Sequence, residues 1–287
     1  MTDAQSTGVA LPTKLNIVTM SDKRVLFISQ EIAPYLTGNP LADFGKQLAQ
    51  NVHSHKFEVR TFMPKYGSVN ERRNQLHEVI RLSGLNISID DNDHPLIIKV
   101  ASLQPSRIQV YFIDNDDYFQ KADSDADAIG SNRTDNDERA IFFARGTVET
   151  VKKLKWEPSV ILVNGWMAAL TPIYLRQQGT EDPSLKNAKI VYVITEGEAA
   201  GGIDSRMVEK MAQEKVAARA LKEFKTMPAN TDLLHKMALR NSNAVVVATE
   251  ISDDLRAYIE ELKLPVLEYK IGEDDIDKIY DFYQQLI

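Results

Sequence analysis

Short apolar runs alternate with stretches of helical periodicity along most of the chain, and this alternation limits the possible folds more than any other feature. Strands are predicted where aliphatic, β-branched and aromatic residues cluster, at residues 24–29, 57–63, 160–163, 190–194 and 244–248. Apolar residues recur with helical spacing at residues 41–52, 135–154, 167–178, 233–240 and 252–262. Strands that alternate with helices form βαβ units, whose parallel sheet needs helices on both faces. We therefore predict an α/β fold with a Rossmann-like, doubly wound and mostly parallel sheet.

Some segments depart from that alternation. Residues 79–89, 96–103 and 108–113 predict strands that follow one another closely, as in a small antiparallel hairpin insert. Residues 114–133 are rich in Asp, Asn and Ser and predict a loop, whereas the charged, Ala-rich residues 204–224 predict one long helix.

The last residues of the chain, 274–287, also carry apolar side chains at helical spacing. These are Ile276, Ile279, Tyr280, Tyr283 and Leu286. We expect them to form a C-terminal helix that docks on the core and covers apolar surface.

The length of 287 residues allows one large domain, which we assign to residues 23–287. The polar residues 1–22 predict a disordered N-terminal tail, in which Met20 is an alternative to Met1 as the natural start. The chain has no cysteine, which excludes thiol chemistry and fits a reducing compartment. Acidic and basic residues are interspersed at a net charge of −7, and no run approaches the ~18 apolar residues of a membrane span. We therefore expect a cytoplasmic protein that binds neither nucleic acid nor a membrane.

Four stretches, in order, resemble the glycogen and starch synthases. The family's opening strand, loop and helix are matched by KRVLFISQEIAPYLTGNPLADFGKQLAQ, with FEVRTFMPKYG following at the right distance. The other three stretches are VYFIDNDDYF, TDNDERAIFFARGTVE and PSVILVNGWMAALTPIYLR. A looser match continues through LLHKMALRNSNAVVVATEISDDLRAYI, so that the resemblance covers residues 23–262.

The resemblance implies a fold and a ligand class. Those enzymes have the GT-B fold, in which two Rossmann domains enclose a cleft, and they transfer glucose from ADP-glucose to an α-1,4-glucan. This chain resembles the N-terminal half and lacks a counterpart of the second domain, which supplies most of the nucleotide-sugar site. The ligands that the resemblance implies are ADP-glucose or an α-glucan, held weakly, with no separate cofactor.

The chain differs from the family at the motifs that carry chemistry. The family's first loop, Lys-Thr-Gly-Gly-Leu, approaches the donor phosphates, whereas the stretch Thr37-Gly38-Asn39-Pro40-Leu41 has no lysine and contains a proline without an N–H. The His-Asp-Trp-His motif is replaced by Asn164-Gly165-Trp166-Met167, and an Ile-His-Asn segment by Ile194-Thr195-Glu196. We therefore assign no catalytic residue.

A few residues are vestigial candidates for substrate binding: Thr37, Gly38, Asp135, Asn136, Arg139 and Trp166. Asp135, Asn136 and Arg139 match the family's Asp-Asn-x-x-Arg pattern; the alternatives are helix caps for the first two and a surface ion pair for the arginine. Trp166 follows a strand at the sheet edge where α/β folds bind ligands, so it is either a sugar-stacking residue or a core residue. For the loop at Thr37 and Gly38 the alternative is a plain strand-to-helix connection.

Two further signals are weaker. Gly201-Gly202 lacks the spacing of a phosphate-binding loop and predicts an ordinary loop. The nearby carboxylates of Glu196, Glu198 and Asp204 predict a solvated acidic loop, so we assign no metal site.

Three functions are compatible with these observations. The first is a catalytically degenerate binding or regulatory protein of the glycogen and starch synthase type. The second is a glycosyltransferase whose cleft is completed by a partner chain or by self-association. The third is a structural interaction protein that has kept the fold and lost ligand binding.

Overall fold

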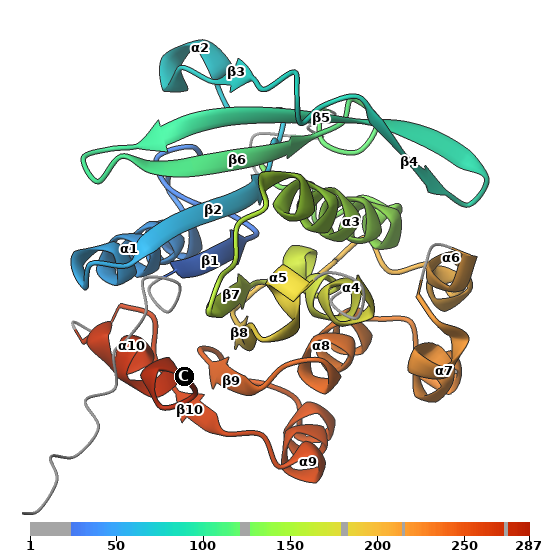
Figure 1. Ribbon diagram of the computed structural model, residues 1–287. Coiled ribbons are helices and arrows are strands. Elements are labelled where there is room, and N and C mark those ends of the chain that lie inside the picture. The colour runs from blue at the N-terminus through green and yellow to red at the C-terminus, as the bar shows by residue number, and fades with distance from the viewer. Residues whose placement is uncertain (1–23, 121–126, 179–182, 214–215, 273–274) are drawn as a thin grey trace, which may run out of the picture.

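The computed structural model describes residues 24–120, 127–178, 183–213, 216–272 and 275–287, so the predicted tail at residues 1–22 lies outside it. Its centre is a large β-sheet (Figure 1). The strands are β1 Arg24–Ser29, β2 Glu58–Pro64, β3 His77–Glu78, β4 Leu85–Ile89, β5 Asn92–Leu103, β6 Ile108–Asp114, β7 Val160–Asn164, β8 Lys189–Ile194, β9 Ala244–Val247 and β10 Val266–Glu268.

The sheet is mostly parallel, as predicted. Its strand order is β10-β9-β8-β7-β1-β2-β6-β5-β3, with β4 paired to β5. All neighbouring pairs from β10 to β6 are parallel. The order of the strands along the chain reverses between β1 and β7, and this is the topological switch point of a doubly wound sheet.

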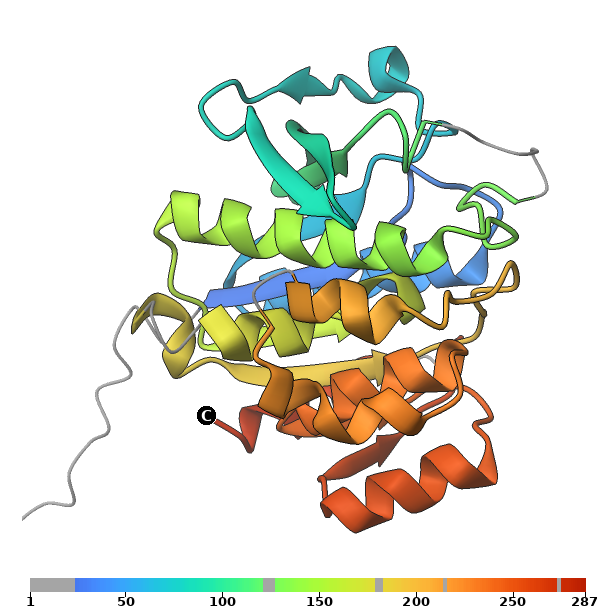
Figure 2. The same ribbon diagram turned by 90° about the vertical axis from the view of Figure 1, so that its right-hand side faces the viewer.

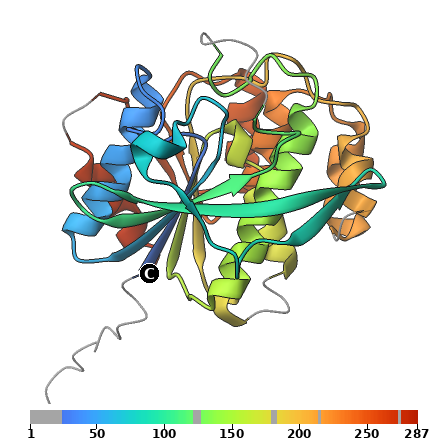
Figure 3. The same ribbon diagram turned by 90° about the horizontal axis from the view of Figure 1, so that it is seen from above.

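Helices cover both faces of the sheet, because its central strands are buried on both sides. Figures 1 and 3 show α1 and α10 on one face and α3, α4 and α8 on the other. The helices are α1 Pro40–Ser54, α2 Glu71–Asn74, α3 Asn136–Leu154, α4 Thr171–Gln178, α5 Pro183–Lys186, α6 Met207–Gln213, α7 Ala218–Leu221, α8 Thr231–Arg240, α9 Asp253–Leu262 and α10 Asp277–Gln284, with 3₁₀ turns η2 Trp166–Ala168 and η3 Lys222–Thr226. No helix in these described ranges is long and apolar enough to cross a membrane.

The predicted hairpin is part of the main sheet. Strand β6 pairs in parallel with β2, and β5 then pairs antiparallel with β6, so the hairpin extends the sheet at one edge. The segment predicted as one strand at residues 79–89 contains only β4, because the chain turns before it. Backbone N–H groups of Leu82 and Ser83 donate to the carbonyl of Val79, and Gly84 follows with a φ of 85°.

The single long helix predicted for residues 204–224 is wrong. The chain there forms α6, α7 and η3, which are separate elements. Met207 and Val216 are both buried. At 3.6 residues per turn, a spacing of nine residues puts two side chains on opposite sides of a helix. One straight helix could not bury both against the same core, which agrees with the end of α6 at Gln213.

The C-terminal helix packs on α1. Ile279 and Tyr283 of α10 are fully buried. The ring of Tyr280 stacks on His55 with 3.7 Å between the centroids. Asp277 accepts a hydrogen bond from the side chain of Asn51 at 2.6 Å.

Candidate functional site

All the sequence-predicted site residues lie in the connections and first helical turns that follow the strands at the carboxyl edge of the sheet, toward which the strand arrows point on the right of Figure 2. Thr37 and Gly38 follow β1, the segment with Asp135, Asn136 and Arg139 follows β6, and Trp166 follows β7. Parallel strands bring such loops to one edge, where open α/β folds bind their ligands. The fold therefore gathers the candidates at one edge. The burial and the hydrogen bonds of each side chain determine whether it can contact a ligand there.

Arg139 is a buried structural residue, and the alternative of a surface ion pair is wrong. The residue is 1% exposed. Its guanidinium donates hydrogen bonds to the carbonyl oxygens of Tyr118 at 2.8 Å, Gly130 at 2.8 Å and Ile129 at 2.6 Å. It also donates to Oδ1 of Asn136 at 2.6 Å. The arginine therefore holds the loop between β6 and α3 and does not face solvent.

The side chains of Asp135 and Asn136, which precede Arg139, are also held by hydrogen bonds to the protein. Asn136 is fully buried, and its Nδ2 donates to the carbonyl of Ser131 at 2.8 Å. Asp135 occupies the N-cap position of α3, but its side chain makes no capping hydrogen bond. Its carboxylate accepts instead from Nε of Arg133 at 2.8 Å. Neither side chain caps the helix, and both fix the loop that precedes it.

Trp166 is 1% exposed, which matches the core alternative. Gly197 lies over it, since a Cβ at Gly197 would be 3.9 Å from Cδ1 of the indole. Nε1 of Trp166 has no hydrogen-bond partner within the described part of the chain. Because only 1% of the residue is exposed, the ring offers no face on which a sugar can stack.

The loop at Thr37 and Gly38 is exposed and makes a plain connection to α1. The helix start is satisfied internally: Oδ1 of Asn39 accepts from the N–H of Leu41 at 2.9 Å. Nδ2 of Asn39 donates to Glu31 at 2.7 Å, and burial raises the pKa of that carboxyl. A buried carboxylate and a self-capped helix start do not favour a phosphate at this loop.

Buried polar side chains lie at the switch point between β1 and β7. Gln30 accepts from the N–H of Met167 at 3.3 Å and donates to Glu31 at 3.0 Å. A Cβ at Gly165 would lie 2.8 Å from Cβ of Gln30, so the glycine permits this close approach. These residues therefore bond to one another at the place where a doubly wound sheet commonly binds its ligand.

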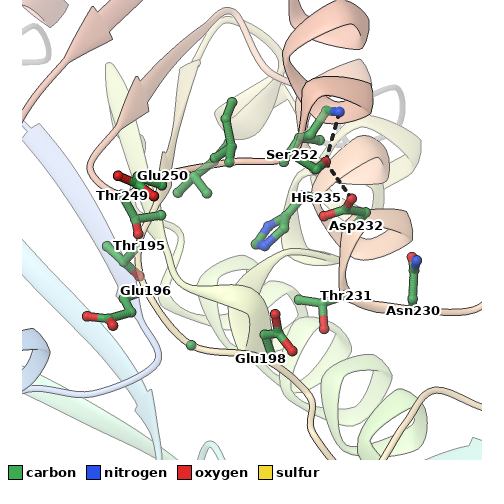
Figure 4. A pocket seen from close by; sticks show the side chains of 14 residues that line it. Thr195, Glu196, Glu198, Asn230, Thr231, Asp232, His235, Thr249, Glu250 and Ser252 are labelled. Carbon is green, nitrogen blue, oxygen red and sulfur yellow. Dashed lines mark hydrogen bonds between the residues drawn. The ribbon is translucent and has the colours of Figure 1, made fainter.

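An open cavity of about 390 Å³ lies two strands further along the edge, and sequence reasoning missed it. Figure 4 shows it between the carboxyl ends of β8 and β9 and the N-terminal ends of α8 and α9. Its polar lining consists of Thr195, Glu196, Glu198, Asn230, Thr231, Asp232, His235, Thr249, Glu250 and Ser252. Its size is within the ~300–1,000 Å³ typical of small-molecule sites.

His235 projects into this cavity, as Figure 4 shows, toward Thr195, Glu198 and Thr231. The residue is 5% exposed, and burial lowers the pKa of the imidazole to about 4, so it is neutral at pH 7. Its Nδ1 lies 2.7 Å from the hydroxyl of Tyr192, and that hydroxyl donates to the carbonyl of Gly165 at 3.4 Å. Nδ1 of His235 is therefore engaged with Tyr192.

Each helix that begins beside the cavity is capped by its own side chain. Oδ1 of Asn230 accepts from the N–H of Leu233, and Oγ of Ser252 accepts from that of Leu255, both at 3.1 Å. The Ser252 hydroxyl donates to Asp232 at 2.8 Å. The charged side chains of the lining are acidic: Glu196, Glu198, Asp232 and Glu250. In the sequence, the signal that points to the cavity is a pair of capping residues, Asn230 and Ser252. They begin two helices at this edge.

No group of three or more His, Cys, Asp or Glu side chains in the described ranges is arranged to hold a metal ion. Asp204, which the sequence places near Glu196 and Glu198, pairs with Lys210 at 3.1 Å.

The doubly wound sheet, with its ligand-facing loops at the carboxyl edge, defines a Rossmann-type domain of the kind that forms one half of a GT-B glycosyltransferase. The chain matches the model of the starch synthase catalytic domain family over residues 24–257, and it belongs to that family.

Known proteins place the chain in the same group. The glycogen synthase of Chlorobium luteolum is 34% identical over 195 residues, which are 68% of this chain and 40% of that protein. The glycogen synthase of Pelodictyon phaeoclathratiforme is 30% identical over 237 residues, 82% of this chain and 48% of the relative. The chain thus spans less than half the length of these curated relatives. The catalytic domain of starch synthase IV from Arabidopsis thaliana, bound to ADP and acarbose, superposes with a TM-score of 0.67 at 15% identity, over 89% of this chain and 53% of that one.

Proposed function

We propose that this domain is a non-catalytic, binding or regulatory member of the starch synthase family. The observation that carries the proposal is the burial or replacement of the motif residues. Asn136, Arg139 and Trp166 are buried, and the positions of the replaced histidines are taken by the buried Asn164 and Met167 and by Thr195. Retaining glucosyl transfer needs groups placed around the reacting centre, each typically worth ~2.7–4 kcal/mol. Their combined loss is expected to abolish transfer.

The ligand that we propose for the edge is sugar-like, as an α-glucan is, and weakly held. Starch synthase IV binds ADP and acarbose, but the cavity of this chain does not suit a diphosphate. It is lined by Glu196, Glu198, Asp232 and Glu250, with no lysine or arginine in the lining. Carboxylates repel a diphosphate, whereas they accept hydrogen bonds from sugar hydroxyls. We therefore expect ADP-glucose to bind more weakly than a glucan.

The test is incorporation of labelled glucose from ADP-glucose into glycogen by the purified chain, with an authentic glycogen synthase as the positive control. We expect no incorporation above the blank without enzyme. Incorporation that rises steeply with protein concentration, or that appears with an added partner chain, would favour the alternative, a transferase completed by self-association or by a partner.

A further inference from the structure

We propose that a second binding site, for a small anion, lies at the carboxyl ends of β2 and β6, where the carboxylate of Glu71 occupies the position of the ligand. The ligand is a small molecule whose phosphate or carboxylate group displaces Glu71 from Lys65 and Lys99. In the strand order, β2 and β6 lie on the other side of the switch point from β8 and β9. This site is therefore separate from the acidic cavity and does not depend on the sugar-like ligand proposed above.

Two lysine side chains converge on one carboxylate oxygen. Oε1 of Glu71 lies 2.9 Å from Nζ of Lys65 and 2.7 Å from Nζ of Lys99. The side chain of Lys65 is 4% exposed and that of Lys99 is 18% exposed, so both charges are largely withdrawn from water. Two ammonium groups that are directed at one oxygen are suited to bind a phosphate or a carboxylate.

The lysines are held in place by groups other than Glu71. Lys65 follows β2 directly and donates to Oε1 of Gln120 at 3.1 Å. Lys99 of β5 pairs at 2.8 Å with Asp114, the buried last residue of β6. Gln120 also donates to Asp114 at 2.7 Å, which joins the two lysine positions. If Glu71 moves away, two ammonium groups face one carboxylate, and one positive charge is left for an incoming anion.

Glu71 is the most exposed member of this cluster. Its side chain is 40% exposed, and it begins α2, a four-residue helix in which no residue is buried. Partial burial would raise the pKa of Glu71, but hydrogen bonds from Lys99 and Lys65 lower it, so the group is a carboxylate at neutral pH. An anion from the solvent can thus reach the lysines by replacing an exposed side chain, without opening the core.

The experiment titrates inorganic phosphate against the whole chain at pH 7, with chloride added to keep the ionic strength constant. Binding is followed by the shifts of backbone amide signals in NMR spectra, and citrate is titrated in the same way. We expect saturable shifts at residues 65–72 and 99 with at least one of the two probes. The probe that binds more tightly identifies the ligand group as a phosphate or a carboxylate. If neither probe gives saturable shifts at these residues, the proposal is overturned.

Variants test the displacement of Glu71. Glu71→Gln removes the competing charge, so the tighter probe is expected to bind at least roughly tenfold more tightly than to the wild type. Lys65→Gln removes one ammonium group and leaves Glu71 paired with Lys99, and it is expected to weaken binding by a similar factor. Glu157→Gln, an exposed acid between α3 and β7, is the control and should bind as the wild type does.

The melting temperature gives an independent measurement, because Glu71→Gln leaves buried lysine charges incompletely paired and lowers stability. The tighter probe should raise the melting temperature of Glu71→Gln by more than that of the wild type. Unchanged affinity in Glu71→Gln or in Lys65→Gln, or an equal rise in melting temperature for both proteins, would contradict the site.

Discussion

Arg139 illustrates how a residue that matches a family motif acquires a purely structural explanation. Its guanidinium replaces water for three carbonyl groups and one amide oxygen that would otherwise be unsatisfied. The charge also lies 5.6 Å from the ring of Phe119. Burial lowers the pKa of the guanidinium. The four hydrogen bonds hold the group in position.

The first prediction concerns this arginine. Arg139→Lys keeps the charge and loses the planar fork that reaches several acceptors, and hydrogen bonds to charged groups are each worth about 1.5–3 kcal/mol. We expect the free energy of unfolding to fall by more than ~3 kcal/mol in a denaturant titration. Arg72→Lys, at an exposed position of α2, is the control and should leave the midpoint unchanged. A midpoint for Arg139→Lys within error of the wild type would show that the loop does not depend on the fork.

The second prediction concerns the pH dependence of stability. The pKa of His235 is about 4 in the folded protein, below the value of 6.5 for an unperturbed histidine. Between these values the unfolded chain binds a proton that the folded chain does not, so the free energy of unfolding falls as the pH falls from 6.5 to 4. The loss is on the order of 3 kcal/mol for a shift of this size.

Other groups titrate in the same window, so the comparison must be between variants. Burial raises the pKa of Glu31 and Asp137, which opposes the effect of His235 as the pH falls. His235→Gln should therefore have a shallower decline in stability below pH 6.5 than the wild type, measured by unfolding at a series of pH values. His53→Gln, an exposed histidine, should follow the wild-type curve. Parallel curves for the wild type and His235→Gln would rule out a buried neutral imidazole.

At the scale of elements, α10 completes the layer on the α1 face. Its two fully buried side chains, Ile279 and Tyr283, cover apolar surface of the core. The ring stack between Tyr280 and His55 fixes its position along α1.

The third prediction follows from that packing. Deletion of residues 275–287 exposes the surface beneath Ile279 and Tyr283, and each lost core side chain costs about 2–5 kcal/mol. We expect a lower melting temperature, binding of a hydrophobic dye and aggregation on concentration. Ile287→Ser changes a half-exposed residue of the same segment and serves as the control. A truncated protein that stays monomeric with the melting temperature of the wild type would contradict this role.

At the scale of the whole molecule, polar contacts hold the layers and loops of the carboxyl edge together. Lys210 of α6 donates to Asp137 at 2.8 Å and to Glu138 at 2.7 Å, both on α3. Arg206 pairs with Asp90 in the turn between β4 and β5. The N–H of Gly201 donates to the carbonyl of Ser131 at 2.8 Å. These contacts join the loops that surround the buried motif residues, and an open cavity lined by acidic side chains lies at the same edge.

The order of strands and helices could be predicted from the sequence because the signal is local. Residues 24–29 and 244–248 are continuous apolar runs, as expected of strands buried on both faces. The prediction failed at residues 204–224, where a good helical composition is overridden by the need to bury Met207 and Val216 against the same core. It also missed β10, because three residues are too few to show periodicity.

The sequence by itself determined the class of fold, the family and the loss of the motif histidines, since each of these is written in residue types and their spacing. Only the tertiary structure decided that Arg139 and Trp166 are buried, and that the open cavity lies around His235. The reason is physical: burial of a loop residue depends on which distant segments cover it. Gly197 covers Trp166, and the carbonyl groups of residues 118, 129 and 130 surround Arg139. No local sequence pattern specifies these contacts between distant segments.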